Sequence, residues 1–483
     1  MTSWVEYAAH CSECFIATWC SVMVQRHGAV FHLPLNIPMP EAKSKLVSLD
    51  FNLPCSEEQA LAGWLSQGGA CFLDSSDGSG ESSLRFWPRW TCGIDGNGAL
   101  GFTQASQRLA IQGLADPVAG FQKWLDHVLA TVPAGGPHGP GVVIFASYDL
   151  AHLLDPAMPK PRALGPRFPL LYAGCYSWSL RRSSAGKWRL ECVEEEDSLS
   201  AADLARQLRD LALGAKRRPV VPVLEKPAAL WSRGQYGSAF REFKEAIARG
   251  DAYVGNLTQR FVSPMKQGQT LNVVDLYLDL RRSSPASHAC FLEVGNGELG
   301  GGLQHILSSS PERFLRVRLD GDRRRIETCP IKGTRAVDAD AGADRAAQES
   351  LLASEKERAE LTMIVDLERN DLGRVAKTGT VSVPSLGRLV SHGYVHHLHA
   401  EVCAELRDNV TFTDLLRACF PGGSVTGCPK VSAMKILASL EPHARGPYTG
   451  SVLALDSAGN LDSNILIRTI LCEPGCVDRK SVV

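Results

Sequence analysis

Residues 421–430 read Pro421-Gly422-Gly423-Ser424-Val425-Thr426-Gly427-Cys428-Pro429-Lys430. Glycines let a backbone approach a neighbouring group closely, and Pro429 suits the first turn of a helix. A helix that begins there offers free N–H groups and positive potential to an anion. The spacing of glycine and lysine differs from that of a Walker loop. The segment therefore predicts a glycine-rich turn that leads into a helix. Taken alone, it is equally consistent with a structural role and with a ligand-binding role.

A long amphipathic helix is predicted upstream, over residues 344–370. Its apolar face comprises Leu352, Ala359, Met363 and Leu367. Glu357 and Glu360 are three residues apart and therefore share a face of this helix. A helical glutamate can supply one of the few protein carboxylates that Mg²⁺ takes, which leaves positions for substrate and water.

From Leu35 to about Pro227, short β-like runs alternate with breaks rich in glycine, proline and serine. These runs include residues 70–73 and 141–145. The alternation predicts a mixed sheet domain. A helix is predicted after it, over residues 236–249. Its apolar positions are Phe240, Phe243 and Ile247.

Residues 1–34 differ from the rest because cysteine and histidine are crowded there without clear periodicity. Cys11 and Cys14 have a spacing that suits zinc ligation by thiolates, but a single pair gives this interpretation little weight. The alternatives are a poorly ordered extension and a start codon placed too far upstream. We treat the segment as an atypical N-terminal extension.

The composition favours an enzyme that acts on small molecules. The chain has 51 basic and 52 acidic residues among 483, so no excess of positive charge predicts binding to nucleic acid or an anionic membrane. No stretch of 18 or more apolar residues and no signal peptide is evident, and we expect a cytoplasmic location. The 15 cysteines are scattered, which predicts reduced and mostly buried thiols.

Two further side chains are candidates for catalytic roles. Lys332 stands between Ile331 and Gly333 at the end of a predicted strand, and a partly desolvated lysine can act as a nucleophile. Glu312 follows Pro311 and can act as a general acid where its surroundings raise its pKa. The alternatives are a solvated surface lysine and an ordinary glutamate paired with an arginine.

Taken together, these segments resemble the chorismate-utilising enzymes, the family of anthranilate synthase component I, isochorismate synthase and aminodeoxychorismate synthase component I. The similarity runs from about Leu35 to Leu471. Its motifs are Gly250-Asp251, Asn256 to Phe261, Ser310 to Phe314, Met363 to Arg374, the glycine-rich segment and Asp462 to Thr469. The resemblance implies an α+β fold, in which two large antiparallel sheets pack face to face with helices outside and the active site in a cleft between them.

Within that family, Lys332 indicates the aminodeoxychorismate branch, because anthranilate synthases typically have alanine at this position. The resemblance implies that this lysine attacks ring carbon two of chorismate and expels the hydroxyl at carbon four. Ammonia then adds at carbon four and the lysine leaves, with the enolpyruvyl group retained. The route leads to p-aminobenzoate and folate.

The resemblance also assigns the other site residues. Glu312 becomes the general acid and Glu360 a Mg²⁺ ligand. The substrate-binding residues are His397, Thr426, Gly427, Tyr448 and Arg468, the last two gripping the enolpyruvyl carboxylate. Without the resemblance, Tyr448 is as well explained as a core tyrosine and Arg468 as an edge-strand arginine. A separate glutamine amidotransferase subunit is the expected partner and source of ammonia.

The expected organisation is an N-terminal region over 35–227, a chorismate-binding catalytic domain over 236–477 that is truncated at its C-terminus, and an artefactual, foreign tail over 478–483. In the family, a glycine-rich strand and a final helix with a second metal-binding glutamate follow Thr469. Departures from the family pattern are Cys329, Leu361, Leu453 and the pair Ser287-His288. The rival functions are anthranilate synthase component I, which eliminates pyruvate, and a non-catalytic protein that binds chorismate or the amidotransferase.

Overall fold

A computed structural model describes residues 45–104, 107–111, 114–162, 168–195, 199–216, 223–295, 303–392 and 394–482. Both interpretations of residues 1–34, the zinc pair Cys11 and Cys14 and the atypical extension, lie outside these residues. Residues 42–483 form one compact unit. Within the described parts, no helix is long and apolar enough to cross a membrane.

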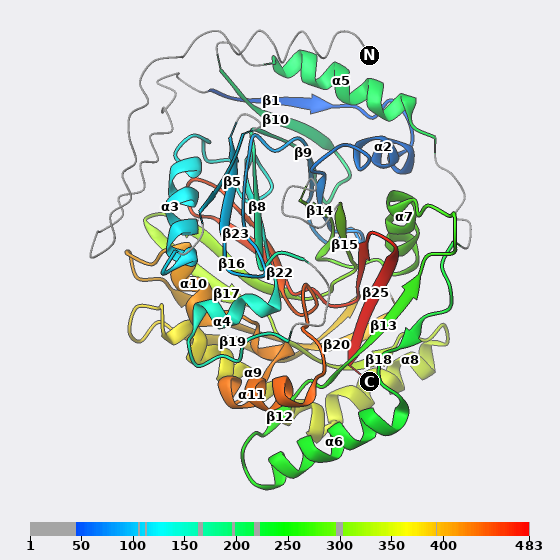
Figure 1. The fold of residues 1–483 in the computed structure, drawn as a ribbon, viewed down its shortest axis with the longest axis vertical. Helices are drawn as coiled ribbons and strands as arrows, with labels where there is room; N and C mark the ends of the chain where they lie inside the picture. The colour runs from blue at the N-terminus through cyan, green and yellow to red at the C-terminus, as the bar shows by residue number, and fades with distance from the viewer. Residues whose placement is uncertain are drawn as a thin grey trace. The chain divides into compact units, whose positions relative to one another are not determined.

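Two large antiparallel sheets form the centre of this unit, as expected (Figure 1). The first has the order β1 (Lys45–Phe51), β10 (Trp188–Glu194), β9 (Trp178–Arg182), β3 (Ser82–Arg85), β2 (Cys71–Asp74), β14 (Ala289–Val294), β15 (Gln304–Ser308), β24 (Thr469–Glu473), β25 (Cys476–Val482), β13 (Thr258–Pro264), β11 (Ala228–Ala229). The predicted run at residues 70–73 corresponds to β2.

The second sheet has the order β18 (Ile331–Ala336), β20 (Val395–Glu405), β17 (Arg323–Thr328), β16 (Arg313–Asp320), β23 (Leu461–Asn464), β22 (Ser451–Leu455), β7 (Gly141–Ala146), β8 (Leu171–Tyr176), β4 (Trp90–Ile94), β5 (Leu100–Gln104), β6 (Gln107–Ile111), with β19 (Ser382–His392) also paired to β20. The predicted run at residues 141–145 corresponds to β7. Because β2 pairs with β14 and β7 with β22, each sheet combines strands from the N-terminal and C-terminal halves of the chain.

A buried apolar cluster joins the two sheets face to face. It includes Phe145 of β7, Tyr176 of β8, Leu292 of β14 and Leu471 of β24. Burial of such side chains is the main stabilising term of the fold, at roughly 1.5–3 kcal/mol for each large apolar side chain. The face-to-face packing confirms the expected α+β architecture.

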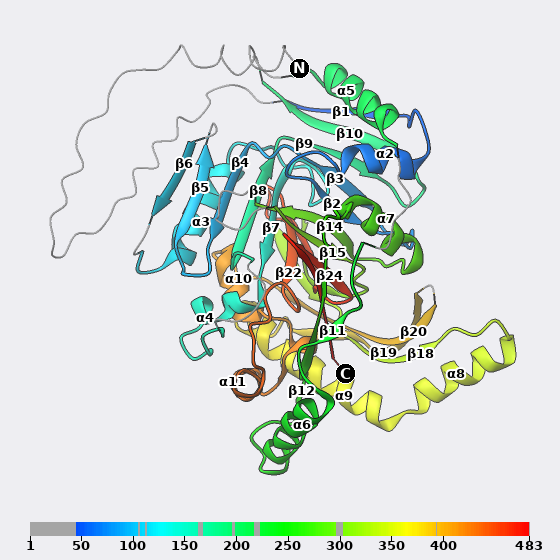
Figure 2. The ribbon, with the colours of Figure 1, turned by 45° about the vertical axis from the view of Figure 1, so that its right-hand side comes forward.

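The helices lie outside the sheets (Figure 2). They are α2 (Glu57–Trp64), α3 (Pro117–Leu129), α4 (Ala151–Leu154), α5 (Ala201–Gly214), α6 (Arg233–Ala248), α7 (Val273–Ser283), α8 (Ala341–Ala353), α9 (Glu355–Gly373), α10 (Phe412–Cys419) and α11 (Lys430–Leu440). A second cluster packs Trp64, Leu208 and Tyr277, from α2, α5 and α7, on the outer face of the first sheet. A small ladder of β12 (Val254–Gly255) and β21 (Gly427–Cys428) connects α6 to the glycine-rich segment.

The helix predicted over residues 236–249 begins earlier, at Arg233. Ser232 and Gln235 form a capping box that satisfies free N–H groups of the first turn. The predicted apolar face was wrong for Phe240 and Ile247, which are 47% and 37% exposed. The helix is rotated so that its buried face, which contacts α11, comprises Ala239, Phe243 and Ala246.

The helix predicted over residues 344–370 is two helices, α8 and α9 (Figure 2). Ser354 leaves the helical conformation, and its hydroxyl accepts a hydrogen bond from the Glu357 amide, so it caps α9. The predicted apolar face was also wrong, since Leu352 is 44% exposed. The buried residues of α9 are Leu361, Ile364, Val365, Glu368, Asp371 and Leu372.

Residues 478–482, interpreted from the sequence as part of a foreign tail, form the end of β25. This strand pairs with β24 on one side and β13 on the other. The buried Asp478 carboxylate lies 2.5 Å from Arg260 Nε. In the described residues, β24 therefore has a hydrogen-bonded partner on both edges.

Candidate active site

Lys332 lies at a β-bulge on β18. The pairing register of β18 with β20 shifts between Lys332 and Thr334, and Gly333 between them has φ of 69°. A side chain at Gly333 would be strained, and its Cβ would lie 2.7 Å from Leu351 Cδ1. Bulges redirect neighbouring side chains, and Lys332 Nζ donates a 2.9 Å hydrogen bond to the Ser424 carbonyl oxygen. Lys332 was expected at the end of a strand but is the second residue of β18, and the bulge there brings it to the glycine-rich segment.

Glu312 is buried beside this lysine. The Ile331 amide donates to Glu312 Oε1 at 3.4 Å. Burial raises the pKa of the Glu312 carboxyl, while the Ser424 hydroxyl and the charges of Lys332 and Arg468 act in the opposite direction. A carboxyl with a raised pKa retains its proton closer to neutrality, as a general acid requires.

Lys430 holds the glycine-rich segment in place through contacts of its ammonium group. Its ammonium lies 2.6 Å from Asp371 Oδ2 and donates to the carbonyl oxygens of Cys419 and Pro421 at 2.8 Å. The predicted helix begins at Lys430, directly after Pro429. Lys430 thus has a structural role at the base of the segment.

Thr426 and Gly427 are buried within the same segment. The Thr426 hydroxyl donates to the carbonyl oxygens of Gly422 and Gly423, at 3.1 and 3.2 Å. A Cβ at Gly427 would lie 2.3 Å from the Val254 carbonyl oxygen, so the contact of β21 with β12 requires glycine there. Both residues therefore shape the segment itself.

His397 is buried on β20 opposite the bulge. Its Nδ1 lies 2.9 Å from the Gly333 carbonyl oxygen and 3.2 Å from Thr334 Oγ1. A donor bond from Nδ1 to that carbonyl defines the orientation of the ring. His397 and Lys332 are thus held by the same irregularity of the sheet.

Tyr448 and Arg468 lie on two chain segments that pair with each other. The Thr449 amide donates to the Leu466 carbonyl oxygen at 2.8 Å, and the Ser309 amide donates to that of Arg468 at 3.1 Å. Thr449 and Arg468 have φ of 63° and 49°, conformations that cost non-glycine residues of order 1–3 kcal/mol and cluster at functional sites. Burial lowers the pKa of Arg468 and the charge of Glu312 opposes this, which indicates that the two side chains are close.

Glu360 lies apart from these contacts, on α9 beside β18. Its carboxylate is 33% exposed and lies 3.8 Å from Lys356 Nζ. Glu357, one turn earlier, packs against Gly333, where an added Cβ would lie 3.3 Å from its Cβ. A partly exposed carboxylate on this face is chemically suited to be one ligand of Mg²⁺.

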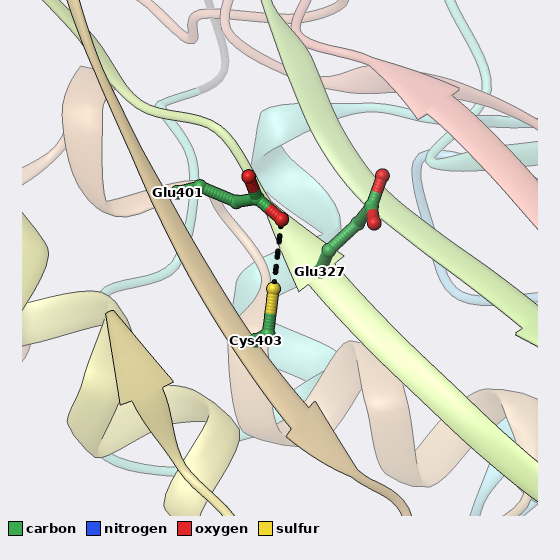
Figure 3. A group of neighbouring side chains, drawn as sticks. All are labelled: Glu327, Glu401 and Cys403. Carbon is green, nitrogen blue, oxygen red and sulfur yellow. Dashed lines mark hydrogen bonds between the residues drawn. The ribbon is translucent and has the colours of Figure 1, made fainter. Parts of the chain in front are cut away.

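In the described residues, Glu327, Glu401 and Cys403 form a group of side chains of the types that ligate metals (Figure 3). The Cys403 thiol donates to Glu401 Oε1 at 3.0 Å. Glu327 Oε1 lies 3.3 Å from nitrogen atoms of both Arg316 and Arg318. These guanidinium groups already neutralise Glu327, so the group is better described as an ion-pair network than as a metal site.

A cavity of about 510 Å³ is lined by residues of both sheets, and neither Lys332 nor Glu312 is among its lining residues. Its lining includes Arg181, Ser287, His288, Arg313 and Asp462. The pair Ser287-His288, which departs from the family pattern, therefore faces this cavity. The Arg313–Asp462 ion pair, at 2.9 Å, forms part of the wall.

Two residues without an assigned role also contact the site. The Asn256 side chain donates to the Ser424 carbonyl oxygen at 3.0 Å. Glu368 is buried, accepts a 3.1 Å hydrogen bond from Thr328, and has a pKa raised well above its usual range by burial and the nearby Glu312 carboxyl. Both lie in the quoted motifs, but no local pattern indicates which residues face the site.

Comparisons with known proteins identify the family of this chain. Residues 88–480 match the family described as chorismate binding enzyme. The aminodeoxychorismate synthase component 1 of Klebsiella aerogenes is 37% identical over 368 residues, 75% of this chain and 76% of that protein. The anthranilate synthase component 1 of Bacillus caldotenax is 34% identical over 379 residues, 73% and 71% of the two chains.

Among solved structures, anthranilate synthase component I from Streptococcus pneumoniae superimposes with a TM-score of 0.67 at 26% identity. The superposition covers 83% of this chain and 86% of that one. The match in sequence spans most of both large sheets and includes every candidate site residue from Glu312 to Arg468. The chain therefore belongs to the chorismate binding enzyme family.

Proposed function

We propose that the protein converts chorismate and ammonia to 4-amino-4-deoxychorismate, on the route to p-aminobenzoate and folate. The observation that carries the proposal is the position of Lys332. Its Nζ lies at the Ser424 carbonyl beside the buried Glu312, in the segment where the family's anthranilate-forming members typically have alanine. The 37% identical Klebsiella aerogenes protein, an aminodeoxychorismate synthase component 1, supports this assignment.

In the proposed reaction, Lys332 gives its ammonium proton to solvent, to be taken back at the end of the cycle, and its Nζ attacks ring carbon two of chorismate. Both ring double bonds shift, from C1=C2 and C5=C6 to C1=C6 and C4=C5, the bond between carbon four and its hydroxyl breaks, and Glu312 donates the proton with which the hydroxyl leaves as water. Ammonia then adds at carbon four, both double bonds shift back, and the bond from carbon two to Nζ breaks. The Glu312 carboxylate recovers its proton from the added ammonia, so both enzyme groups are regenerated.

Substrate binding falls to the residues around these two groups. Arg468, with paired N–H donors, and Tyr448 would hold the enolpyruvyl carboxylate, while His397, Thr426 and Gly427 would line the pocket. Because the Thr426 hydroxyl donates within its own segment, we expect its backbone and methyl group to face the substrate. When bound at Glu360, Mg²⁺ would offset the charge of the ring carboxylate and orient the substrate.

The ammonia would come from a separate glutamine amidotransferase subunit, which would release it from glutamine and pass it to this chain. Free ammonium should replace that subunit in the test tube. The protein's location in the cytoplasm is part of the same proposal, because chorismate is a soluble metabolite.

A second candidate is formation of anthranilate with elimination of pyruvate. It is favoured by the relative from Bacillus caldotenax and by the fold shared with the Streptococcus pneumoniae enzyme. Lys332 argues against it, because the lyase reaction requires no covalent attachment to carbon two.

Product analysis tests the proposal. The protein is incubated with chorismate, ammonium and Mg²⁺, with an EDTA-treated sample as control, and the products are separated and weighed by mass spectrometry. We expect 4-amino-4-deoxychorismate without pyruvate, dependent on Mg²⁺. Anthranilate and pyruvate would support the lyase, and the absence of both aminodeoxychorismate and anthranilate would support a non-catalytic binding protein.

A further inference from the structure

We propose that Asn256 is a positioning residue for Lys332, acting through the backbone carbonyl of Ser424. The inference rests on the function proposed for Lys332. The Ser424 carbonyl oxygen accepts hydrogen bonds from two side chains, Lys332 Nζ at 2.9 Å and Asn256 Nδ2 at 3.0 Å. A carbonyl oxygen has two lone pairs, so the two donors together occupy its acceptor capacity. Asn256 thereby defines the direction from which Lys332 Nζ can donate to the Ser424 carbonyl oxygen.

Asn256 is itself held to the glycine-rich segment by its backbone. Its amide donates to the Thr426 carbonyl oxygen at 3.2 Å, and its carbonyl oxygen accepts from Arg445 Nη2 at 2.5 Å. The side chain of Asn256 thus bonds to Ser424 and its backbone to Thr426, the two residues that flank Val425 in the glycine-rich segment. A displacement of the Ser424 carbonyl would have to break or stretch these bonds.

A buried ion pair anchors the arrangement. Arg445 Nη2 lies 2.7 Å from Glu441 Oε1, and the two side chains are 2% and 5% exposed. Arg445 Nη1 donates to the Val425 carbonyl oxygen at 3.3 Å. The amide and hydroxyl of Thr258 donate to Glu441 Oε1 at 3.1 and 3.0 Å. The strand that follows Asn256 and the segment that bears Ser424 are therefore tied to one rigid pair.

The position of Ser424 matters for both proposed reacting groups. Its carbonyl accepts from Lys332, and its hydroxyl influences the pKa of Glu312. A lysine side chain has about 2 kcal/mol of rotamer entropy to lose, so an acceptor at a defined place restricts where Nζ waits for the substrate. A displacement of about 1 Å in such a group can lower the rate about 100-fold.

The experiment compares Asn256→Ala with a matched control, Gln259→Ala. Gln259 lies three residues further along the same stretch of chain, and its side chain pairs with the Trp231 backbone at 2.8 and 3.3 Å. Each substitution thus removes one hydrogen-bonding side-chain amide from the same stretch of chain. We expect similar losses of thermal stability, but only Asn256→Ala should lower kcat, by about 10- to 100-fold. KM for chorismate should change much less, because Lys332 acts in the chemical step.

A second measurement needs no turnover. The proteins are treated with an amine-acetylating reagent over a range of pH, and the acetylation rate of each lysine is followed by peptide mass spectrometry. In Asn256→Ala, Lys332 should be released from the Ser424 carbonyl and react severalfold faster than in the wild type. Lys377, which pairs with Glu405 at 2.7 Å on another part of the second sheet, serves as the internal reference and should not change.

The outcomes separate the two proposals. A wild type that makes no aminodeoxychorismate contradicts the proposed function, but the acetylation rates still decide the positioning role. The positioning role would be overturned if Lys332 is acetylated at the same rate in Asn256→Ala as in the wild type. It would also be overturned if Asn256→Ala and Gln259→Ala change kcat and KM by the same amounts. If Asn256→Ala does not fold, Asn256→Ser, whose hydroxyl is too short to reach the carbonyl, carries the same expectations.

Discussion

Lys430→Met should strongly destabilise the protein. The Lys430 ammonium is bonded to Asp371 and to two backbone carbonyl oxygens, at distances between 2.6 and 2.8 Å. The side chains of the ion pair are 10% and 9% exposed. Methionine has a similar length but no donor, so Asp371 would be left buried without its cation. Removing one partner of a buried ion pair typically costs about 3–5 kcal/mol.

The loss should depend on pH through Asp371. Burial raises the pKa of this carboxyl and Lys430 lowers it, so the folded-state pKa should rise further in Lys430→Met. A carboxyl whose folded pKa lies above its unfolded value of about 3.9 holds a proton that the unfolded chain has released. The variant therefore loses stability as pH rises, and its difference from the wild type should be larger at pH 8 than at pH 5.

The assay is urea unfolding followed by tryptophan fluorescence at both pH values. Lys430→Met, Asp371→Asn and the double variant are compared with the wild type, and the double variant should recover most of the loss because neither charge remains. A loss below about 1 kcal/mol in Lys430→Met at pH 8 would refute the reasoning. Lack of recovery in the double variant would do the same.

Three further predictions concern the carboxyls and the lysine of the site. Lys332→Ala should lower aminodeoxychorismate formation by about 100-fold or more, because it removes the proposed nucleophile; full activity of the purified variant contradicts the covalent route. Glu312→Gln should preserve chorismate binding, measured by calorimetry, and suppress turnover, because glutamine cannot deliver a proton; an unchanged kcat rules out the general-acid role. Glu368→Gln should become more stable relative to the wild type as pH rises above about 4.3, by up to about 1.4 kcal/mol per pH unit. The reason is that the raised pKa of Glu368 makes the native wild type retain a proton that its unfolded chain releases. Parallel pH profiles of unfolding for Glu368→Gln and wild type would contradict that assignment.

Sequence patterns succeeded where the information is local. The runs at residues 70–73 and 141–145 are strands, and the helix after the glycine-rich segment begins at Lys430, directly after Pro429. Most of the described cysteines are buried free thiols, as their scattered spacing predicts. In each case neighbouring residues alone carry the signal, through periodicity, caps and breakers.

The same patterns failed where packing decides. Phe240 and Ile247 share a helical face with Phe243 in a simple wheel, yet only Phe243 is buried, because the partner helix α11 selects a face rotated by one position. The apolar residues around Ser354 suggested one continuous helix. Its hydroxyl instead caps the next helix, since this bond competes with the helical conformation at the same residue.

By itself, the sequence determined the family, the α+β class and the identity of the candidate reacting groups, because each depends on residue types in a given order. Only the tertiary structure decided which groups meet. Glu312, Lys332 and Ser424 are separated by up to 112 positions, and they converge because the bulge after Lys332 directs its side chain to a segment held by Lys430 and Arg445. A backbone carbonyl such as that of Ser424 has no residue-type signature, so its role as an acceptor follows from the arrangement of the sheets and cannot be seen in the chain alone.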